Sequence, residues 1–270
     1  MRQLSLEPLS LPQLSGLDLV KAAAGAGFDL VSFVLETPDA QNLPVDPMRH
    51  DATLRSQVRD AMRAAGLGMS TLECFNLAPD PNFASFAEAL AAGGELGARN
   101  ATAIIWENSD RQDALRSFCR LCDMAAEHGM DVNMEFISVS RSMGTMEDGL
   151  AFVRDAGRAN AGLMMDLLHV VRGGTRIEAV RDVPPELVTG IQLSDGPLSI
   201  SEAQLLHEAG GNRVDLGTGE FPIQAFVRAL PPTVALGIEI PRADSVGRTD
   251  PFARAVELHD MAVAMLAEIS

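Results

Sequence analysis

The feature that most constrains the fold is a regular alternation of short apolar runs with longer amphipathic stretches along the chain. The runs rich in β-branched residues predict strands, and the Ala-, Leu- and Arg-rich stretches with helical spacing predict helices. Such alternation is typical of a parallel sheet covered by helices. Eight repeats of about 33 residues fit a closed barrel better than a doubly wound sheet. We therefore expect an α/β protein, a single parallel eight-stranded (β/α)₈ TIM barrel, in one domain over residues 1–270.

The expected strands are Gln3–Glu7, Asp29–Val34, Gly68–Cys74, Ala101–Trp106, Asp131–Phe136, Gly162–Leu167, Leu187–Leu193 and Val234–Ile240. The expected helices are Leu17–Gly27, Asp51–Ala65, Asn82–Leu96, Asp110–His128, Met146–Ala156, Thr175–Val180, Phe221–Leu230 and Asp250–Ile269. The residues between the seventh strand and Phe221 form a long mixed stretch. No nucleotide-binding glycine motif interrupts the pattern.

Charge and hydropathy exclude several classes of protein. The formal net charge is −16 and Lys21 is the single lysine, whereas a nucleic-acid-binding protein carries a basic face. No run of about 18 apolar residues suggests a membrane helix, and the opening segment lacks the apolar core of a signal peptide. We expect a cytoplasmic protein with a small-molecule substrate and no nucleic-acid or membrane partner. The sequence leaves open whether it forms a homo-oligomer.

The cysteines do not indicate a disulfide framework. Three are present, and Cys119 and Cys122 form a C-x-x-C inside an expected helix. A zinc site would need a second pair of ligands nearby. We expect these two side chains to pack within the fold, with a redox or metal role as the weaker alternative.

Polar side chains stand where the late strands end. They are Glu135, Asp166, Gln192 and Glu239, each within an apolar stretch. In a parallel barrel the carboxyl ends of the strands form the active-site face. Buried carboxylates that converge there repel one another, and a divalent cation removes that repulsion. Any one of these carboxylates could instead pair with an arginine of the next loop, but four such oxygen donors in sequence favour a metal site.

These motifs together resemble the xylose isomerase-like superfamily of TIM barrels, which contains sugar isomerases, epimerases and related lyases. The resemblance rests on Met134-Glu135-Phe136, Asp166-Leu167-Leu168-His169, Gln192-Leu193-Ser194-Asp195, the turn Gly217-Thr218-Gly219 and Ile238-Glu239-Ile240-Pro241. It covers nearly the whole chain and is strongest from Asp131 to Pro241. It implies that Glu135, Asp166, Gln192 and Glu239 bind one divalent metal ion.

Gln192 departs from the histidine that many members of the superfamily carry. An amide oxygen beside three carboxylates gives an all-oxygen ligand set, which favours Mn²⁺ or Mg²⁺ and leaves Co²⁺ or Zn²⁺ as alternatives. The metal would chelate a carbonyl and its neighbouring hydroxyl, so that a carboxylate could remove the carbon-bound proton between them. Glu135 and Glu239 are the expected catalytic carboxylates. Isomerisation, epimerisation and dehydration share this first step.

The resemblance therefore predicts an isomerase or epimerase of a small ketose or keto-polyol. The alternative is a dehydratase of the 3-dehydroshikimate or inosose type. Ile137 stands where other dehydratases of the superfamily carry a histidine, two residues beyond the first metal glutamate. A DNA-repair endonuclease would need a histidine-rich zinc cluster and a basic face, and a barrel that had lost catalysis would not need all four ligands.

Four further residues are expected to bind substrate. His169 completes the Asp-x-x-His motif, and Arg213 precedes the glycine-rich turn. Trp106 ends the fourth strand and Glu107 follows it, where they could reach the mouth of the barrel.

Overall fold

The computed structural model describes residues 2–37, 44–77, 79–106, 110–244 and 246–269. Over these residues the strands form one closed barrel in the order β1 to β8, and β8 pairs back with β1. Every neighbouring pair is parallel. The (β/α)₈ barrel expected from the sequence is therefore confirmed. In the described part of the chain, no helix is both long and apolar enough to span a membrane.

The strands are β1 (Leu4–Leu6), β2 (Leu30–Val34), β3 (Gly68–Asn76), β4 (Asn100–Ile104), β5 (Asp131–Glu135), β6 (Ala161–Asp166), β7 (Val188–Leu193) and β8 (Leu236–Ile238). The helices are α1 (Gly16–Ala26), α2 (Ala52–Ala65), α3 (Phe83–Leu96), α4 (Arg111–Ala126), α5 (Met146–Ala156), α6 (Leu167–Arg172), α7 (Ile177–Val180), α8 (Glu202–Gly211), α9 (Ile223–Ala229) and α10 (Pro251–Ala267). Short 3₁₀ turns occur at Pro8–Ser10, Pro47–Arg49 and Pro185–Leu187.

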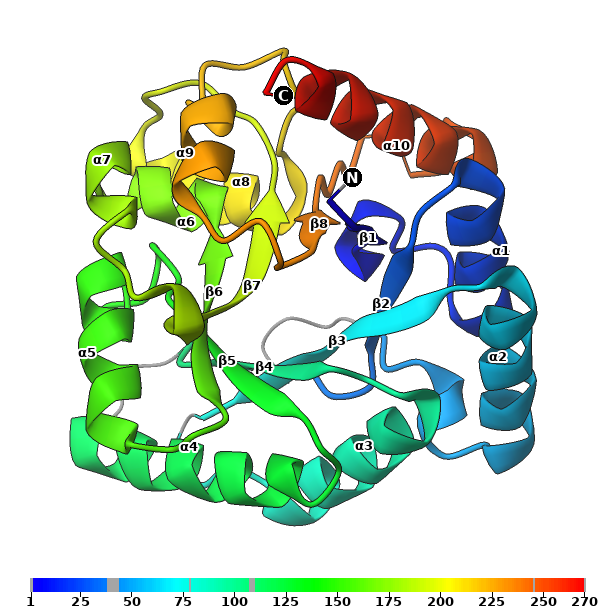
Figure 1. The fold of residues 1–270 in the computed structure, drawn as a ribbon, viewed down its shortest axis with the longest axis horizontal. Coiled ribbons are helices and arrows are strands. Elements are labelled where there is room, and N and C mark those ends of the chain that lie inside the picture. The colour runs from blue at the N-terminus through cyan, green and yellow to red at the C-terminus, as the bar shows by residue number, and fades with distance from the viewer. Residues whose placement is uncertain (1, 38–43, 78, 107–109, 245, 270) are drawn as a thin grey trace.

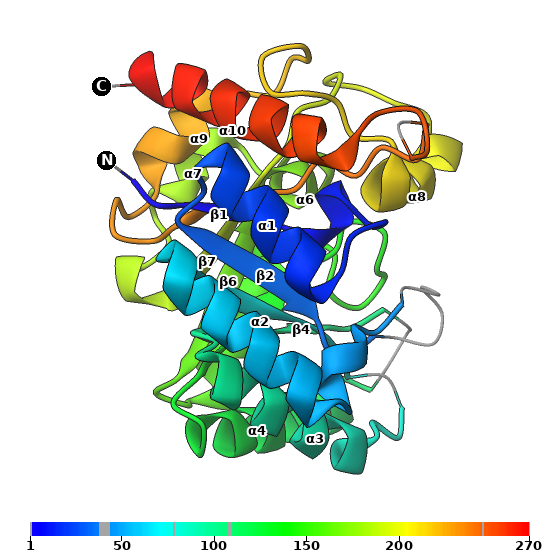
Figure 2. The same ribbon diagram turned by 90° about the vertical axis from the view of Figure 1, so that its right-hand side faces the viewer.

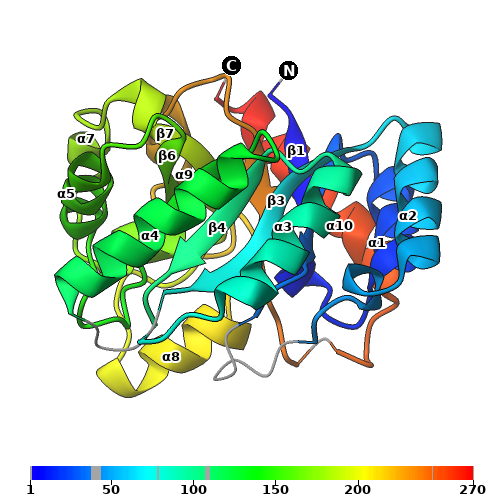
Figure 3. The same ribbon diagram turned by 90° about the horizontal axis from the view of Figure 1, so that it is seen from below.

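The long helices surround the strands as an outer layer, which Figure 1 shows in a view along the barrel. Helices α1, α2 and α10 cover one side of it (Figure 2). Helix α8 lies differently, beyond one end of the strands, while α3 and α4 run along their sides (Figure 3). That end is the carboxyl end of the strands, because α8 follows β7 and contributes side chains to the pocket there.

Local sequence signals fix where the helices begin. The side chains of Asp51 and Asp110 accept hydrogen bonds from the first backbone N–H groups of α2 and α4. Thr145 and Asp148 form a reciprocal capping box at the start of α5. These contacts satisfy N–H groups that have no partner inside the helix.

The structure differs from the sequence-based boundaries around the last three strands. Helix α6 begins directly at the end of β6, because the Asp166 side chain accepts the N–H of Leu168 at 2.9 Å and caps the helix. Helix α8 occupies the stretch to which no element was assigned, and its capping box joins Ser201 to Gln204. Strand β8 is shorter than expected, since the N–H of Ile240 donates to Ser10 Oγ rather than to a strand.

The hydrophobic core fills the layer between strands and helices. Phe118 on α4 and Phe152 on α5 are fully buried there, with ring centroids 5.4 Å apart. Cys122 on the same α4 is also buried, whereas Cys119 is partly exposed and donates to the Ala156 carbonyl at 3.6 Å. Both cysteines therefore have packing positions in the fold.

Phe118→Ala should lower the free energy of unfolding by about 3–5 kcal/mol, since it removes a buried ring and leaves a cavity. Phe252→Ala makes the same chemical change at a side chain that is 41% exposed. We expect that control to cost less than about 1 kcal/mol. Urea unfolding followed by circular dichroism measures both, and equal losses would contradict the assignment of Phe118 to the core.

Candidate metal centre and active site

The four strand-end residues singled out in the sequence lie close together at the carboxyl ends of β5 to β8. Asp166 on β6 and Gln192 on β7 are register partners, and Gln192 is in turn paired with Gly237, two residues before Glu239. Gln192 Nε2 donates to Glu239 Oε1 at 3.2 Å. Glu135 is also buried and lies at the end of β5. The closed barrel therefore gathers the four side chains at one mouth.

Arg213 is the internal counter-ion of this cluster. Its Nη1 lies 2.8 Å from Asp166 Oδ2 and 3.0 Å from Glu239 Oε2, and it also donates to the Glu239 carbonyl at 3.3 Å. The guanidinium is buried with both carboxylates. The sequence predicted a substrate-binding role for Arg213. The structure places it at the pocket wall but already engaged by two of the expected metal ligands.

Burial makes ionisation of these carboxyls unfavourable. It raises the pKa of Glu239 to about 8, against the opposing effect of Arg213. Burial, followed by the charges of Glu239 and Asp166, also raises the pKa of Glu135 well above its usual range. A carboxyl in this condition is protonated near neutral pH unless a cation stabilises its charge. The cluster is therefore suited to bind a cation with release of protons.

His169 on α6 approaches the same carboxylates. Its Nε2 lies 3.8 Å from Glu135 Oε1 and 3.9 Å from Asp166 Oδ2, a spacing at which the three residues could hold one metal ion only if Nε2 carried no hydrogen. Its Nδ1 accepts the backbone N–H of Ser138 at 3.2 Å. Neutral imidazole with an acceptor at Nδ1 carries its hydrogen on Nε2. Burial lowers the pKa of His169 to about 4, so the ring is neutral at pH 7 and suited to donate to an oxygen in the pocket.

The chemistry of the donors fits a divalent cation. Gln192 Oε1 and Asp166 Oδ2 are buried acceptor atoms with no hydrogen-bond donor among the described residues, although Arg213 pairs with the latter by charge. A buried acceptor without a partner is costly, and a metal ion would satisfy it. Glu135, Asp166, Gln192 and Glu239 provide only oxygen ligands, the type that Mg²⁺ and Mn²⁺ prefer.

Two buried glutamates of the early strands were missed in the sequence. Glu73 on β3 accepts from Gln192 Nε2 at 3.5 Å, and burial together with Glu135 and Glu239 raises its pKa well above the usual range. Glu7 follows β1, and its buried Oε2 has no hydrogen-bond partner in the part of the chain that the structure describes. Both follow apolar strand residues, which is the signal that identified the late strands. Applied to every strand, it would have found them.

The same signal also selects Glu36, which has a different role. Its carboxylate pairs with Arg49 at 3.1 Å and accepts from Ser85 Oγ at 2.7 Å. It does not line the pocket at the mouth. Here an arginine of the next loop neutralises the carboxylate at the end of a strand. A glutamate in this sequence pattern can therefore either join the cluster at the mouth or form an ion pair away from it.

Asp195, which follows Gln192, supports a turn. Its buried carboxylate accepts the backbone N–H groups of Gly217, Gly219 and Phe221, each at 3.0 Å. A Cβ at Gly219 would lie 2.3 Å from Asp195 Oδ1, which explains why this turn requires glycine. Asp195 thus holds the chain between α8 and α9 in place beside the mouth.

A pocket of about 330 Å³ opens at the mouth. Glu73, Glu135, Glu239, His169 and Arg213 form its polar side. Trp106 lines another part of the wall, as expected, beside Ile104 and Ile137. Glu107, also expected to contact substrate, lies outside the described residues.

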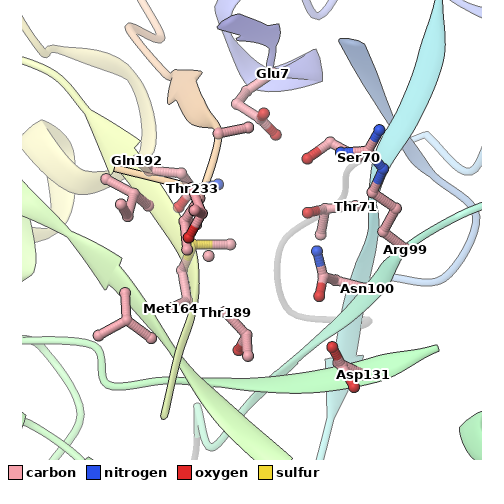
Figure 4. Close-up of a pocket in the computed structure, with 15 residues that line it drawn as sticks. Glu7, Ser70, Thr71, Arg99, Asn100, Asp131, Met164, Thr189, Gln192 and Thr233 are labelled. Atoms are coloured by element: carbon pink, nitrogen blue, oxygen red, sulfur yellow. The ribbon is translucent and has the colours of Figure 1, made fainter. Parts of the chain in front are cut away.

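A second cavity, of about 240 Å³, reaches the cluster from the opposite end of the barrel. Figure 4 shows Glu7 and Gln192 facing this space together with Thr71, Asn100 and Thr189, which stand near the amino ends of their strands. The barrel interior below the candidate metal ligands therefore contains several polar side chains, whereas aliphatic side chains fill most barrels of this class.

Residues 20–261 match the family described as xylose isomerase-like TIM barrel, and the chain belongs to that family. A curated relative is the 3-dehydroshikimate dehydratase of Pseudomonas aeruginosa strain PAO1, which is 30% identical over 122 residues. That match covers 45% of this chain and 18% of the relative, so most of the relative has no counterpart in the alignment.

Solved structures share the fold at low sequence identity. A xylose isomerase-like TIM barrel/4-hydroxyphenylpyruvate dioxygenase fusion protein superimposes with a TM-score of 0.81 and 18% identity, covering 99% of this chain and 43% of the fusion. The IOLI protein with a bound zinc atom gives 0.78 and 15%, covering 100% and 99%. L-Ribulose 3-epimerase gives 0.71 and 19%, covering 100% and 96%. At these identities the likeness establishes the fold alone.

The raised pKa of Glu239 gives a pH dependence with a definite sign. The folded value is about 8 against an ordinary 4.5, so the metal-free fold binds more protons than the unfolded chain between these values. Its free energy of unfolding should therefore fall as the pH rises through that window, by up to about 1.4 kcal/mol per unit for each such proton. Thermal unfolding at pH 5 to 8 measures this, and Glu239→Gln should flatten the profile.

Glu88→Gln is the control, because this carboxylate is 62% exposed. It should leave the pH profile unchanged. Added Mn²⁺ should restore most of the stability lost at pH 8, since it stabilises the ionised carboxylates. A metal-free protein whose stability rose steadily from pH 6.5 to pH 8 would contradict the protonation scheme.

Proposed function

We propose that this protein is a divalent-metal-dependent isomerase or epimerase that acts on a small ketose or keto-polyol. The observation that carries the proposal is the convergence of Glu135, Asp166, Gln192 and Glu239 beside a pocket, with Arg213 as the sole guanidinium among the described residues lining it. One arginine cannot balance these carboxylates, and a cation held by the four side chains would do so. Mn²⁺ or Mg²⁺ is the preferred ion, with Co²⁺ or Zn²⁺ as alternatives.

The chain's own residues would perform the proton transfers. A carboxylate, Glu135 or Glu239, removes the proton from the carbon beside the substrate carbonyl, and the electron pair of that C–H bond moves toward the carbonyl oxygen. A bound divalent cation would supply the positive charge that stabilises this oxygen. His169, neutral and with its hydrogen on Nε2, donates a hydrogen bond to a substrate oxygen.

The fate of the proton then decides the reaction. Return to the neighbouring carbon interconverts aldose and ketose. Return from the other face to the same carbon inverts it, for which the two carboxylates Glu135 and Glu239 are suited. A protein with the same fold, L-ribulose 3-epimerase, is named for an epimerisation, and this supports the proposed class of reaction.

A dehydratase is the second candidate, and a specific observation favours it. The curated sequence relative is a 3-dehydroshikimate dehydratase. In that reaction the same proton is removed, and a hydroxyl group on the next carbon leaves with a proton as water. Its substrate carries a carboxylate, however, and Arg213, the guanidinium lining the described pocket wall, already pairs with Asp166 and Glu239. The pocket therefore supports the isomerase or epimerase better.

The test is incorporation of deuterium from D₂O, followed by mass spectrometry, with the Mg²⁺-loaded protein. D-Fructose, 2-hydroxycyclohexanone and 3-dehydroshikimate serve as probes. We expect exchange beside the carbonyl of at least one hydroxyketone, and a loss of about 10²- to 10⁴-fold in Glu135→Gln or Glu239→Gln. A product lacking one water molecule would instead identify the dehydratase.

Glu36→Gln is the matched control, because Glu36 is also a buried strand-end glutamate but pairs with Arg49 outside the pocket. Once circular dichroism confirms that this variant is folded, it should retain exchange. No exchange with any probe in protein that binds Mg²⁺ would refute the proposed function.

A further inference from the structure

The walls of the pocket at the mouth differ sharply in polarity. The polar side comes mainly from the ends of β5 to β8 and the segment at Arg213. The facing wall contains Cys74, Ile104 and Ile137, which form a small buried apolar cluster separate from the main core, with Trp106 packed against it. A substrate in this pocket therefore meets carboxylates on one side and an apolar surface on the other.

Helix α8 adds further apolar side chains to the lining of the pocket. Leu206 and Ala209 on this helix line the pocket. The helix is held to the barrel by Glu208, whose carboxylate pairs with Arg172 at 2.6 Å in a buried contact. Leu206 is 58% exposed even so. An exposed leucine at the rim of a cavity gains contact area when an apolar ligand enters.

The described pocket wall has no free positive charge for an anion. Arg213 is engaged by Asp166 and Glu239, and the ring of His169 lies against the carboxyl groups of Glu135 and Asp166. The carboxyl groups of Glu73, Glu135 and Glu239 line the same pocket, so a carboxylate or phosphate on the substrate would lie beside them and find no free cationic side chain in the described wall.

A polyhydroxylated chain also fits poorly. Each hydroxyl placed against Cys74, Ile104 and Ile137 would lose its hydrogen bonds to water, and these side chains offer it no comparable replacement. The hydroxyls of a substrate can be satisfied only on the polar side, where the carboxylates and His169 lie.

We infer that the substrate is an uncharged hydroxyketone with one polar edge and an otherwise apolar body, such as a carbocycle or a deoxygenated chain. This inference rests on the proposed function: it keeps the proton-transfer reaction and replaces the polyhydroxylated ketose with a hydroxyketone that carries few hydroxyl groups. The polar edge lies at Glu135 and His169, and the apolar body contacts Ile104, Ile137 and Leu206.

The test compares binding of three probes to the Mn²⁺-loaded full chain by calorimetry. 2-Hydroxycyclohexanone has the inferred chemistry, D-fructose is a polyol, and hydroxypyruvate is a hydroxyketone with a carboxylate. We expect the cyclic probe to bind at least about tenfold more tightly than either of the others. Tighter binding of D-fructose or hydroxypyruvate, or binding of none of the three, would overturn the inference.

A matched pair of exposed leucines locates the contact. Leu206→Asn should weaken binding of 2-hydroxycyclohexanone by about three- to tenfold, because Leu206 lines the pocket. Leu198→Asn should have no effect, because Leu198 is equally exposed but does not line the pocket. If both variants weakened binding equally, or if neither did, the assignment of Leu206 to the wall that contacts the substrate would be wrong.

Deuterium exchange separates this inference from the proposed function. Exchange of D-fructose in preference to 2-hydroxycyclohexanone would refute the substrate class and leave the function intact. Exchange of no hydroxyketone, despite bound metal, would refute the function itself.

Discussion

The ion pairs of Arg213 with Asp166 and Glu239 hold together the mouth of the barrel. Buried carboxylates repel one another, and a single guanidinium between two of them reduces that repulsion without removing it. The pKa values of Glu73, Glu135 and Glu239 are therefore raised. Burial is the first cause, and the charges of neighbouring carboxylates add to it. The fold thus maintains a site that a divalent cation would stabilise strongly.

The surrounding structure keeps these side chains in place. Asp166 has two tasks, since it pairs with Arg213 and also caps α6, which positions His169. Asp195 accepts three N–H groups of the glycine-rich turn and so orders the segment between α8 and α9. Because these contacts are formed within the protein, binding a substrate need not order the polar side of the pocket.

The barrel and part of its site were predictable from the sequence because both depend on periodicity. Strand ends in a parallel barrel share one face, so Glu135, Asp166, Gln192 and Glu239 could be grouped without coordinates. The metal-binding and catalytic roles of these residues stay predictions. The sequence could not separate Glu73, which faces the cluster, from Glu36, which an arginine neutralises. That difference depends on contacts between distant segments.

The ion pairs of Arg213 could not be predicted from the sequence around it either, because Asp166 and Glu239 lie in distant segments of the chain. Helix α8 was missed because its pattern is short and weakly periodic, although its Ser201–Gln204 capping box is a local signal. The apolar wall of the pocket also arises only when the ends of β3, β4 and β5 meet, which brings Cys74, Ile104 and Ile137 together.

The most direct test of the central claim is the metal content of protein purified without chelator, compared with that of Glu239→Ala. Elemental analysis should find about one Mn or Mg per chain, lost in the variant because one of four oxygen ligands is gone. Absence of metal from the wild-type protein, even after incubation with Mn²⁺, would contradict the account. So would metal retained in full by Glu239→Ala and by Glu135→Ala.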